Sequence, residues 1–162
     1  MKNIVYAQTG EVKEGDRSII LKSGAVGSCI VVTAYNKEFM LGAMAHILLP
    51  GKAPDKKNIA ATKYAQNAVH KLLEIFLDKR IELNELEVCV AGGANVLNRS
   101  NDEICKSNIE SVNEILEDTK VKVQACSLGG ILRRSVSLDI ETGKLYLSVG
   151  DQKEKIFLKF GK

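Results

Sequence analysis

Short apolar runs alternate with polar connections along most of this chain, and the runs have the length and composition of β-strands. Residues 29–35 are rich in β-branched side chains and apolar on both faces, which predicts a buried strand. The polar connection 36–38 leads to residues 39–48 as the antiparallel partner of that strand. Residues 11–16 are predicted to form a polar turn. The other expected strands cover 3–9, 17–22, 86–91, 121–127, 134–140, 144–149 and 154–160, the last of them at a sheet edge.

Two segments instead show the helical spacing of apolar residues. The longer one presents a single broad apolar stripe, made up of Ala61, Tyr64, Ala65, Ala68, Val69, Leu72, Leu73, Phe76 and Leu77. His70 lies off this stripe and is expected at the surface. A shorter stripe predicts a second helix over about 106–118. Because two helices cannot cover both faces of so many strands in a doubly wound sheet, we expect an α+β fold, either a β-sandwich or two sheets flanked by the two helices.

The composition is that of an ordinary globular chain of 162 residues, which we expect to form a single domain over residues 1–162. The net charge of +3 is spread evenly, without a basic cluster interleaved with aromatic residues, and this argues against a nucleic-acid partner. The longest apolar stretch, residues 39–49, contains His46 and is too short to span a bilayer. The N-terminus turns polar at Gln8, before a secretory signal could form, so we expect a cytoplasmic protein with reduced thiols.

The candidate chemistry lies in two neighbouring motifs. Gly24 and Gly27 precede Cys29 at the start of the buried strand, and His46 lies on the predicted partner strand. A thiol becomes nucleophilic as the thiolate, which a nearby imidazole can generate near neutral pH. The glycines allow a sharp turn that leaves the N–H of Cys29 free to face a developing oxyanion. These motifs predict a Cys–His acyl-transfer site, although Cys29 taken without its surroundings is better explained as a buried structural cysteine.

The geometry of the hairpin decides whether the two side chains meet. Symmetric closure about Lys37 would place Cys29 opposite roughly position 45, beside His46. A small register shift or a bulge would then determine whether both side chains share a face. The following loop, residues 50–58, contains both prolines and is expected to form part of the rim of the site.

The other three cysteines have no comparable surroundings. Cys89 and Cys126 lie in predicted strands and are interpreted as small core or strand residues. Cys105 begins the second predicted helix, where the helix dipole could lower its pKa, but no base lies near it in the sequence. No Cys-x-x-Cys pair is present, so we expect neither a structural zinc site nor another metal. Gly92-Gly93 could cradle a phosphate, but no Lys-Ser/Thr follows, and close backbone packing is the better interpretation.

Several motifs, in collinear order over nearly the whole chain, resemble the CheD family of bacterial and archaeal chemoreceptor glutamine deamidases. They are Gly27-Ser28-Cys29, Gly42-Ala43-Met44-Ala45-His46 with residues 47–50, Lys63-Tyr64-Ala65, Ala91-Gly92-Gly93-Ala94, Asn108, Gly129-Gly130, Arg134-Ser135-Val136 and residues 139–144. The resemblance implies a β-sandwich of two mixed sheets flanked by two main helices, similar to the catalytic domain of cytotoxic necrotizing factor toxins.

The same resemblance implies roles for particular residues. Cys29 would be the nucleophile, His46 its base, and Ser23 the hydroxyl residue that orients the imidazole in place of the family's usual threonine. The N–H of Cys29, with that of Gly27 or Ser28, would stabilise the oxyanion. The implied reaction proceeds through a thioester and needs no metal or cofactor.

The resemblance also implies partners and leaves alternatives open. The implied substrate is a glutamine in the cytoplasmic helical region of a chemoreceptor. The implied partner is a CheC-type phosphatase, so the protein could act mainly as a non-catalytic regulator. A papain-like protease is a weaker interpretation, because the chain is short and lacks that family's cysteine surroundings. Two departures from the family pattern, Cys105-Lys106 for Gly-Arg and Ser127-Leu128 for Asp-Thr, could alter the substrate loop or the docking of a partner.

Overall fold

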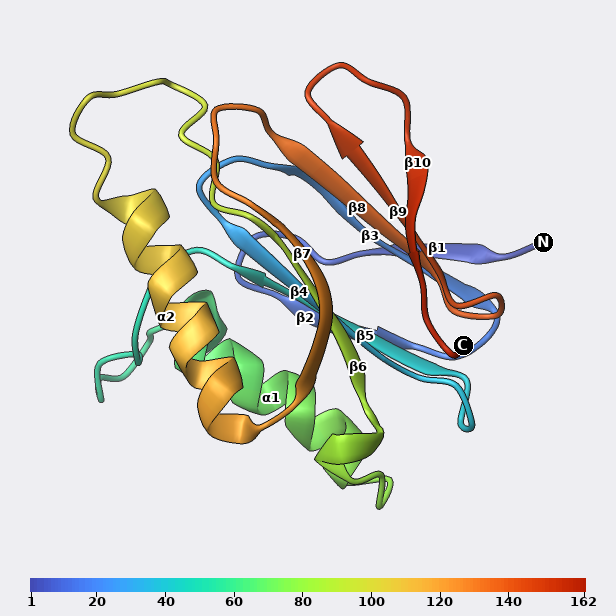
Figure 1. Cartoon of the computed structure of the whole chain (residues 1–162). Helices are drawn as coiled ribbons and strands as arrows, with labels where there is room; N and C mark the ends of the chain where they lie inside the picture. The colour runs from blue at the N-terminus through green and yellow to red at the C-terminus, as the bar shows by residue number, and fades with distance from the viewer.

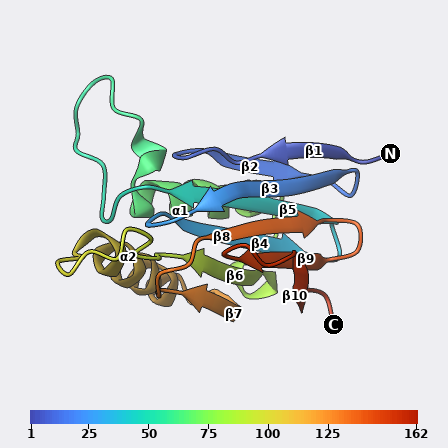
Figure 2. The same ribbon diagram turned by 90° about the horizontal axis from the view of Figure 1, so that it is seen from above.

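Two five-stranded sheets pack against each other in the computed structural model, which describes residues 1–162 (Figures 1 and 2). The strands of the first sheet lie in the order β1 (Asn3–Tyr6), β3 (Ile19–Val26), β8 (Arg134–Asp139), β9 (Lys144–Val149) and β10 (Lys155–Lys159). Those of the second lie in the order β2 (Val12–Gly15), β5 (Leu41–Ile47), β4 (Ile30–Asn36), β6 (Glu87–Gly92) and β7 (Lys122–Leu128). Each sheet contains one parallel pair, β1 with β3 and β6 with β7, and is otherwise antiparallel. The predicted sandwich of two mixed sheets is confirmed, with β10 at an edge.

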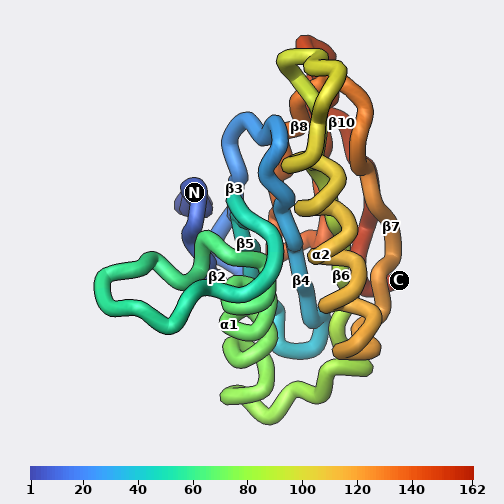
Figure 3. Tube along the Cα trace, turned by 90° about the vertical axis from the view of Figure 1, so that its left-hand side faces the viewer, coloured from blue at the N-terminus to red at the C-terminus, as the bar shows by residue number.

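Both helices cover the outer face of the second sheet (Figure 3). They are α1 (Ala65–Leu77) and α2 (Ile104–Thr119), and short 3₁₀ turns occupy Ala61–Lys63 and Leu83–Glu85. Neither helix combines the length and the apolar character needed to cross a bilayer. The layers are therefore first sheet, second sheet and helices.

The second sheet separates two hydrophobic cores. Twenty buried residues lie between this sheet and the helices, and fourteen lie between the two sheets. Along β4, Ile30 and Val32 face the helices whereas Val31 and Tyr35 face the first sheet, as the two-residue period of a strand requires. All residues of β4 and β5 are buried, which confirms the prediction of a buried strand.

The apolar stripe of the longer helix is confirmed, with a later start. Its buried residues are Ala65, Ala68, Val69, Leu72, Leu73 and Phe76. His70 is exposed, as predicted. The backbone of Tyr64 is extended (φ −95°, ψ 140°), so α1 begins at Ala65 and the stripe's first residue, Ala61, lies in the preceding 3₁₀ turn.

Two predictions in the N-terminal part were wrong, one of a turn and one of the end of a strand. Residues 12–15 form strand β2, where the sequence predicts a turn, and β2 pairs with β5 at the edge of the second sheet. A four-residue edge strand that carries Lys13 and Glu14 has too few apolar positions to be distinguished from a turn. Strand β3 continues past residue 22 to Val26, because a bulge at Ser23-Gly24 lets it keep pairing with β8.

The β4–β5 hairpin also closes differently from the symmetric expectation. Residues 37–40 form the connection, and Val31 pairs with His46. The same register, extended past the end of β4, places Cys29 opposite Leu48 and not near position 45. The longer connection shifts the register, and the position of the nucleophile candidate relative to the histidine follows from that shift.

Candidate active site

Cys29 and His46 lie on the same face of the β4–β5 hairpin, the face that packs against the first sheet. Directly paired residues point to one face of a sheet, and so do residues two apart in one strand. His46 pairs with Val31, which is two residues after Cys29. Cys29 itself packs against the core between the sheets. Cys29 lies in the bend directly before β4, so the shared face rests on this register together with the packing of Cys29 against the inter-sheet core.

The imidazole of His46 is held by the backbone of another segment. The side chain is buried, with 4% of the residue exposed, and its Nδ1 lies 2.9 Å from the carbonyl oxygen of Ala7. Because a carbonyl oxygen can only accept, Nδ1 carries the hydrogen and donates it, and Nε2 keeps its lone pair. This arrangement gives a neutral imidazole that can take up a proton at Nε2. The sequence contains no signal for this contact, since the acceptor is a main-chain atom far from His46 in the chain.

Burial shifts both candidate groups toward their neutral forms. Loss of hydration lowers the pKa of His46 from its ordinary value of 6.5, against smaller opposing effects of the Ala7 carbonyl and of Glu11. Burial also raises the pKa of the half-buried Cys29 thiol. Burial thus favours a neutral thiol at Cys29 and a neutral imidazole at His46, and a proton must leave Cys29 before or during any nucleophilic attack.

The peptide groups around Cys29 are held through their carbonyl groups. The carbonyls of Gly27, Ser28 and Cys29 are all bound by groups of the protein. The donors, in that order, are the N–H of Ala94 (2.9 Å), the side-chain amide of Asn108 (2.9 Å) and the N–H of Gly93 (2.8 Å). The N–H groups of the same three residues donate to no other protein group. Since C=O and N–H of one planar peptide point in opposite directions, these contacts direct the N–H of Ser28 away from Ala94 and that of Cys29 away from Asn108.

Ser23 has other partners than His46. Its hydroxyl donates to the carbonyl of Gly24 (2.7 Å) and accepts the N–H of Val136 (2.9 Å). These contacts lie at the β3–β8 bulge, where Gly24 has a positive φ of 67°. The serine thus satisfies a buried strand N–H at the bulge. The contact that the resemblance implied between Ser23 and the imidazole is made instead by the Ala7 carbonyl.

The Gly92-Gly93 turn packs closely behind Cys29, which agrees with the packing interpretation of this pair. A Cβ atom on Gly92 would overlap the carbonyl oxygen of Cys29, and one on Gly93 would lie 2.6 Å from the side chain of Ile109 on α2. Both glycines also have positive φ angles, 118° and 68°. The backbone of Cys29 can lie against β6 only because position 92 has no side chain.

The remaining cysteines are not brought to His46 by any contact in the structure. Cys89 is buried, as predicted, and burial raises its pKa to about 12. The helix dipole was expected to lower the pKa of Cys105. Burial, and after it the neighbouring Asp102, instead raise this pKa to about 11. Cys126 is a strand residue, one of the two alternatives predicted, and it is exposed because β7 is an edge strand. No three His, Cys, Asp or Glu side chains are grouped so as to hold a metal ion.

The surface next to Ser28 and Cys29 is mixed, with apolar side chains beside the charged Arg99 and Asp102. A depression there is lined by Ser28 and by residues of the segment that leads from β6 into α2. The exposed apolar side chains of this depression are Val96, Leu97 and Ile104. A second segment, residues 129–132, carries the exposed Ile131 and Leu132. The N–H of Asn95 donates to the carbonyl of Gly130 (2.8 Å) and joins the two segments. We call these five apolar residues the apolar mouth.

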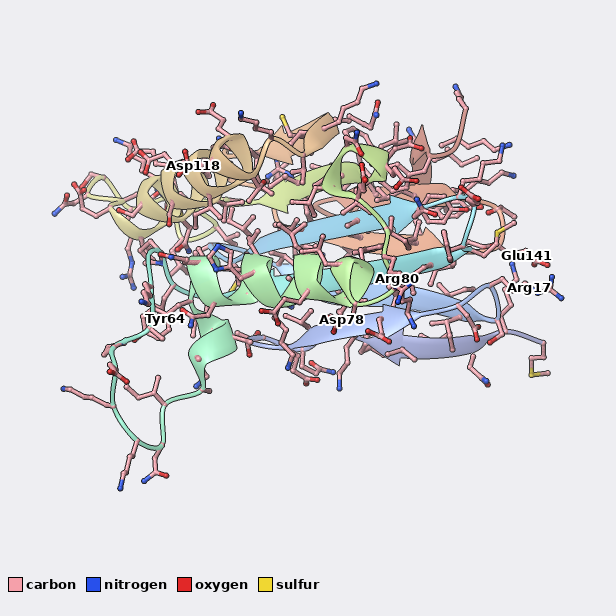
Figure 4. All side chains as sticks on the ribbon, turned by 90° about the horizontal axis from the view of Figure 1, so that it is seen from below. Arg17, Tyr64, Asp78, Arg80, Asp118 and Glu141 are labelled. Atoms are coloured by element: carbon pink, nitrogen blue, oxygen red, sulfur yellow. The ribbon has the colours of Figure 1, made fainter.

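The loop of residues 50–58 projects outward beside α1 (Figure 3). Figure 4 shows Tyr64, at the base of this loop, at one end of α1, and Asp78 at the other end. The loop is anchored by Gly51, whose N–H donates to the Ser111 hydroxyl on α2 (2.8 Å). The segments hydrogen-bonded to residues 27–29 come instead from 92–94 and from α2. Formation of a rim by residues 50–58 therefore stays a prediction.

One departure from the family pattern has a structural consequence at the mouth. Arg134 donates to the carbonyls of Gly129 (2.6 Å) and Leu132 (2.5 Å) and, through Nε, to the Ser127 hydroxyl (3.2 Å). The guanidinium thereby shapes the 129–132 segment, and burial lowers the pKa of Arg134. With serine at position 127, this cation has a hydroxyl partner where the family pattern supplies a carboxylate.

The family model and the curated relatives agree on one family. A family model described as CheD chemotactic sensory transduction matches residues 48–149. The chemoreceptor glutamine deamidase CheD of Thermotoga maritima is 35% identical over 138 residues, which cover 81% of this chain and 85% of that protein. A probable chemoreceptor glutamine deamidase CheD of Chlorobium luteolum is 29% identical over 156 residues, or 96% of this chain and 78% of that protein. Among solved structures, the C-terminal domain of CNFy from Yersinia pseudotuberculosis aligns with 95% of this chain and 62% of its own at 12% identity, with a TM-score of 0.40.

Proposed function

This chain belongs to the CheD family of chemotactic sensory transduction proteins, and we propose that it is a chemoreceptor glutamine deamidase, a hydrolase acting on the side-chain amide of glutamine in a protein. The observation that carries the catalytic part of the proposal is the hairpin register. The pairing of His46 with Val31, which lies two residues after Cys29, and the bond from Nδ1 of His46 to the Ala7 carbonyl support the assignment of these two residues. A nucleophile, a base and an element that orients the base are the minimal parts of a covalent amide hydrolase.

In the first half of the reaction, Nε2 of His46 accepts the proton of Cys29 while Sγ attacks the carboxamide carbon of the glutamine. The electron pair of the C=O bond moves onto the oxygen, which the N–H groups of Cys29 and of Ser28 or Gly27 stabilise. The tetrahedral intermediate then collapses, His46 returns the proton to the leaving nitrogen, and ammonia departs. The product of this half is a γ-glutamyl thioester on Cys29.

In the second half, water gives a proton to His46 and attacks the thioester carbon. The C–S bond breaks, the sulfur regains its proton from His46, and glutamate is released. One water is consumed and one ammonia is formed for each glutamine converted. No step calls on a metal or another cofactor.

The apolar mouth supports a protein as the substrate. Its five apolar side chains are exposed, and an exposed apolar surface of this kind is typical of a site that binds another protein. An amphipathic receptor helix offers an apolar face into which a glutamine side chain can be set. The implied substrate is accordingly the helical region of a chemoreceptor.

A CheC-type phosphatase is proposed as a second partner, on the basis of the resemblance. The apolar mouth could receive a partner helix as well as a substrate helix, and binding of this kind does not need the thiol. A purely regulatory role therefore tolerates the loss of Cys29, whereas deamidation does not. That difference separates the two functions experimentally.

The test is conversion of a receptor cytoplasmic fragment, followed by peptide mass spectrometry that detects replacement of the side-chain NH₂ by OH. We expect Cys29→Ala and His46→Ala each to lower kcat by about 10³-fold or more, with the double variant no worse than either single one. Cys126→Ala, which removes the exposed thiol, is the matched control and should keep wild-type activity. Ser23→Ala should be milder, since its hydroxyl bonds to the β3–β8 bulge.

Near-wild-type activity of either Cys29→Ala or His46→Ala would exclude the proposed chemistry. Cleavage of the receptor backbone without conversion of glutamine would indicate a protease. Binding of a CheC-type phosphatase without deamidation by the wild type would leave only the regulatory role.

A further inference from the structure

Asn108, on the second turn of α2, links two segments of the candidate site. The residue is completely buried. Its Nδ2 donates to the carbonyl of Ser28 at 2.9 Å and to the carbonyl of Leu48 at 3.1 Å. Ser28 directly precedes Cys29, and Leu48 lies two residues after His46. A single amide group thus connects the segment of the nucleophile with the segment of the base.

The orientation of this amide is fixed by its partners. Both hydrogens of the NH₂ group point at carbonyl oxygens, and rotating the amide by half a turn would set oxygen against oxygen. Oδ1, in contrast, is buried and has no hydrogen-bond partner. An unpaired buried acceptor is unfavourable, so the contribution of Asn108 lies in its two donors.

The ladder of the second sheet does not itself fix the peptide before Cys29. The last pair between β4 and β5 is Ile30 with Ile47, and Ser28 and Cys29 lie beyond it. The Ser28 carbonyl and the Cys29 N–H belong to the same planar peptide and point in opposite directions. By binding the Ser28 carbonyl, Asn108 therefore sets the direction of the Cys29 N–H.

We propose that Asn108 is a positioning residue of the reaction: by holding the Ser28–Cys29 peptide between α2 and the end of β5, it aims the Cys29 N–H at the oxyanion. This inference rests on the proposed deamidase function. A donor that is already oriented stabilises the developing charge without reorganisation, and loss of one such donor lowers kcat more than it changes binding. The thiol and His46 are positioned by other contacts.

The test compares Asn108→Leu, which keeps the size of the side chain, and Asn108→Ala with the control Ser111→Ala. Ser111 lies one turn further along α2 and also binds a loop after β5, through the Gly51 N–H, but it does not contact Ser28. We expect both Asn108 variants to lower kcat by about 10²-fold with little change in KM. Alkylation of Cys29 by iodoacetamide, followed by peptide mass spectrometry, should proceed within about twofold of the wild-type rate, since displacement at a saturated carbon forms no oxyanion. Ser111→Ala should leave both rates unchanged.

The amide resonance of Cys29 in ¹⁵N-labelled protein supplies a readout that needs no substrate. It should shift in the Asn108 variants and stay in place in Ser111→Ala. Should the wild type fail to convert glutamine, the proposed function fails, while this resonance still reports whether Asn108 orients the peptide. An unshifted resonance, equal losses in deamidation and alkylation, or failure of both variants to fold would each overturn the positioning role.

Discussion

At the residue scale, the site depends on two groups whose proton affinities are moved by burial in opposite directions. The pKa of Cys29 is raised and that of His46 is lowered, so the charged thiolate–imidazolium pair is disfavoured before substrate binds. The Nδ1 contact with Ala7 fixes the tautomer that leaves the lone pair on Nε2, while burial keeps that nitrogen unprotonated to a lower pH. In the proposed mechanism, proton transfer and attack would occur together, so we expect the pH dependence of the reaction to reflect the neutral pair.

We predict that the acid limb of kcat/KM lies below pH 6.5, the ordinary pKa of histidine, because the pKa of buried His46 is lowered from that value. The same shift affects stability. Below pH 6.5 the unfolded chain takes up a proton that the folded His46 resists, so the free energy of unfolding falls as the pH decreases through 6.5 and toward the lowered pKa. Thermal unfolding of wild type and His46→Gln between neutral and mildly acidic pH measures this contribution.

The variant His46→Gln should lose less stability on acidification than the wild type does. His70→Gln, which removes the exposed histidine, is the control and should follow the wild-type curve. A wild-type acid limb above pH 6.5, or identical acid sensitivity of all three proteins, would contradict the assignment of a neutral buried base.

Cys29 and His46 could be found from the sequence, whereas the groups that orient them could not. A cysteine after glycines and a histidine on the adjacent strand are side-chain signals at short range. The acceptor on Nδ1 is the main-chain oxygen of Ala7, and any residue at that position would supply it. The hydroxyl of Ser23 bonds at a bulge that no sequence pattern revealed, and its role in orienting the imidazole stays a prediction.

At the scale of elements, the site is made where two connections meet, the one between β3 and β4 and the one after β6. Figure 1 shows both connections at the same end of the sandwich, where the one after β6 leads into α2. Gly92 ends β6 directly behind Cys29, and its positive φ and missing side chain allow that contact. A side chain at this position would displace the backbone that carries the nucleophile.

We predict that Gly92→Ala lowers both stability and activity, and more strongly than Gly130→Ala does. Both glycines have positive φ, which costs a residue with a Cβ about 1–3 kcal/mol. Only at Gly92 would the new Cβ meet the Cys29 carbonyl, since nothing lies within 4 Å of that position at Gly130. Denaturant unfolding and deamidation rates of both variants measure the two effects. Equal losses in the two variants would show that the Gly92–Cys29 contact does not matter.

The elements themselves were predicted well where their pattern was long. The buried β4, the stripe of α1 and the C-terminal strands all carry enough apolar positions to reveal their period. The errors concern β2, which is short and charged, and the length of the β4–β5 connection. The register of a hairpin depends on the turn that closes it. The polarity of the sequence alone did not distinguish a connection over residues 36–38 from the observed one over 37–40.

At the scale of the whole molecule, two segments far apart in sequence form one apolar surface beside the thiol. The contact between Asn95 and Gly130 joins them, and Arg134 holds the second segment in shape. All five side chains of the apolar mouth are exposed at this end of the sandwich. The surface is therefore available to a helix presented by another protein, whether a receptor or a regulatory partner.

We predict that a CheC-type phosphatase inhibits deamidation competitively, because both partners would use the apolar mouth. Titration of the phosphatase at several receptor concentrations should raise the apparent KM and leave kcat unchanged. Leu97→Asp places a charge on the most exposed residue of the mouth, with 72% exposure, and should weaken both receptor and phosphatase binding. Leu77→Asp, at the far end of α1 near Asp78 (Figure 4), is the control and should weaken neither.

The two variants also separate competition from indirect effects. Leu97 does not contact the Cys29–His46 pair, so alkylation of Cys29 should proceed at the wild-type rate in Leu97→Asp while KM rises. A shared surface requires that this one substitution reduce both affinities together. Inhibition that excess receptor cannot relieve, or phosphatase binding that survives Leu97→Asp while receptor binding is lost, would mean that the two partners use separate surfaces.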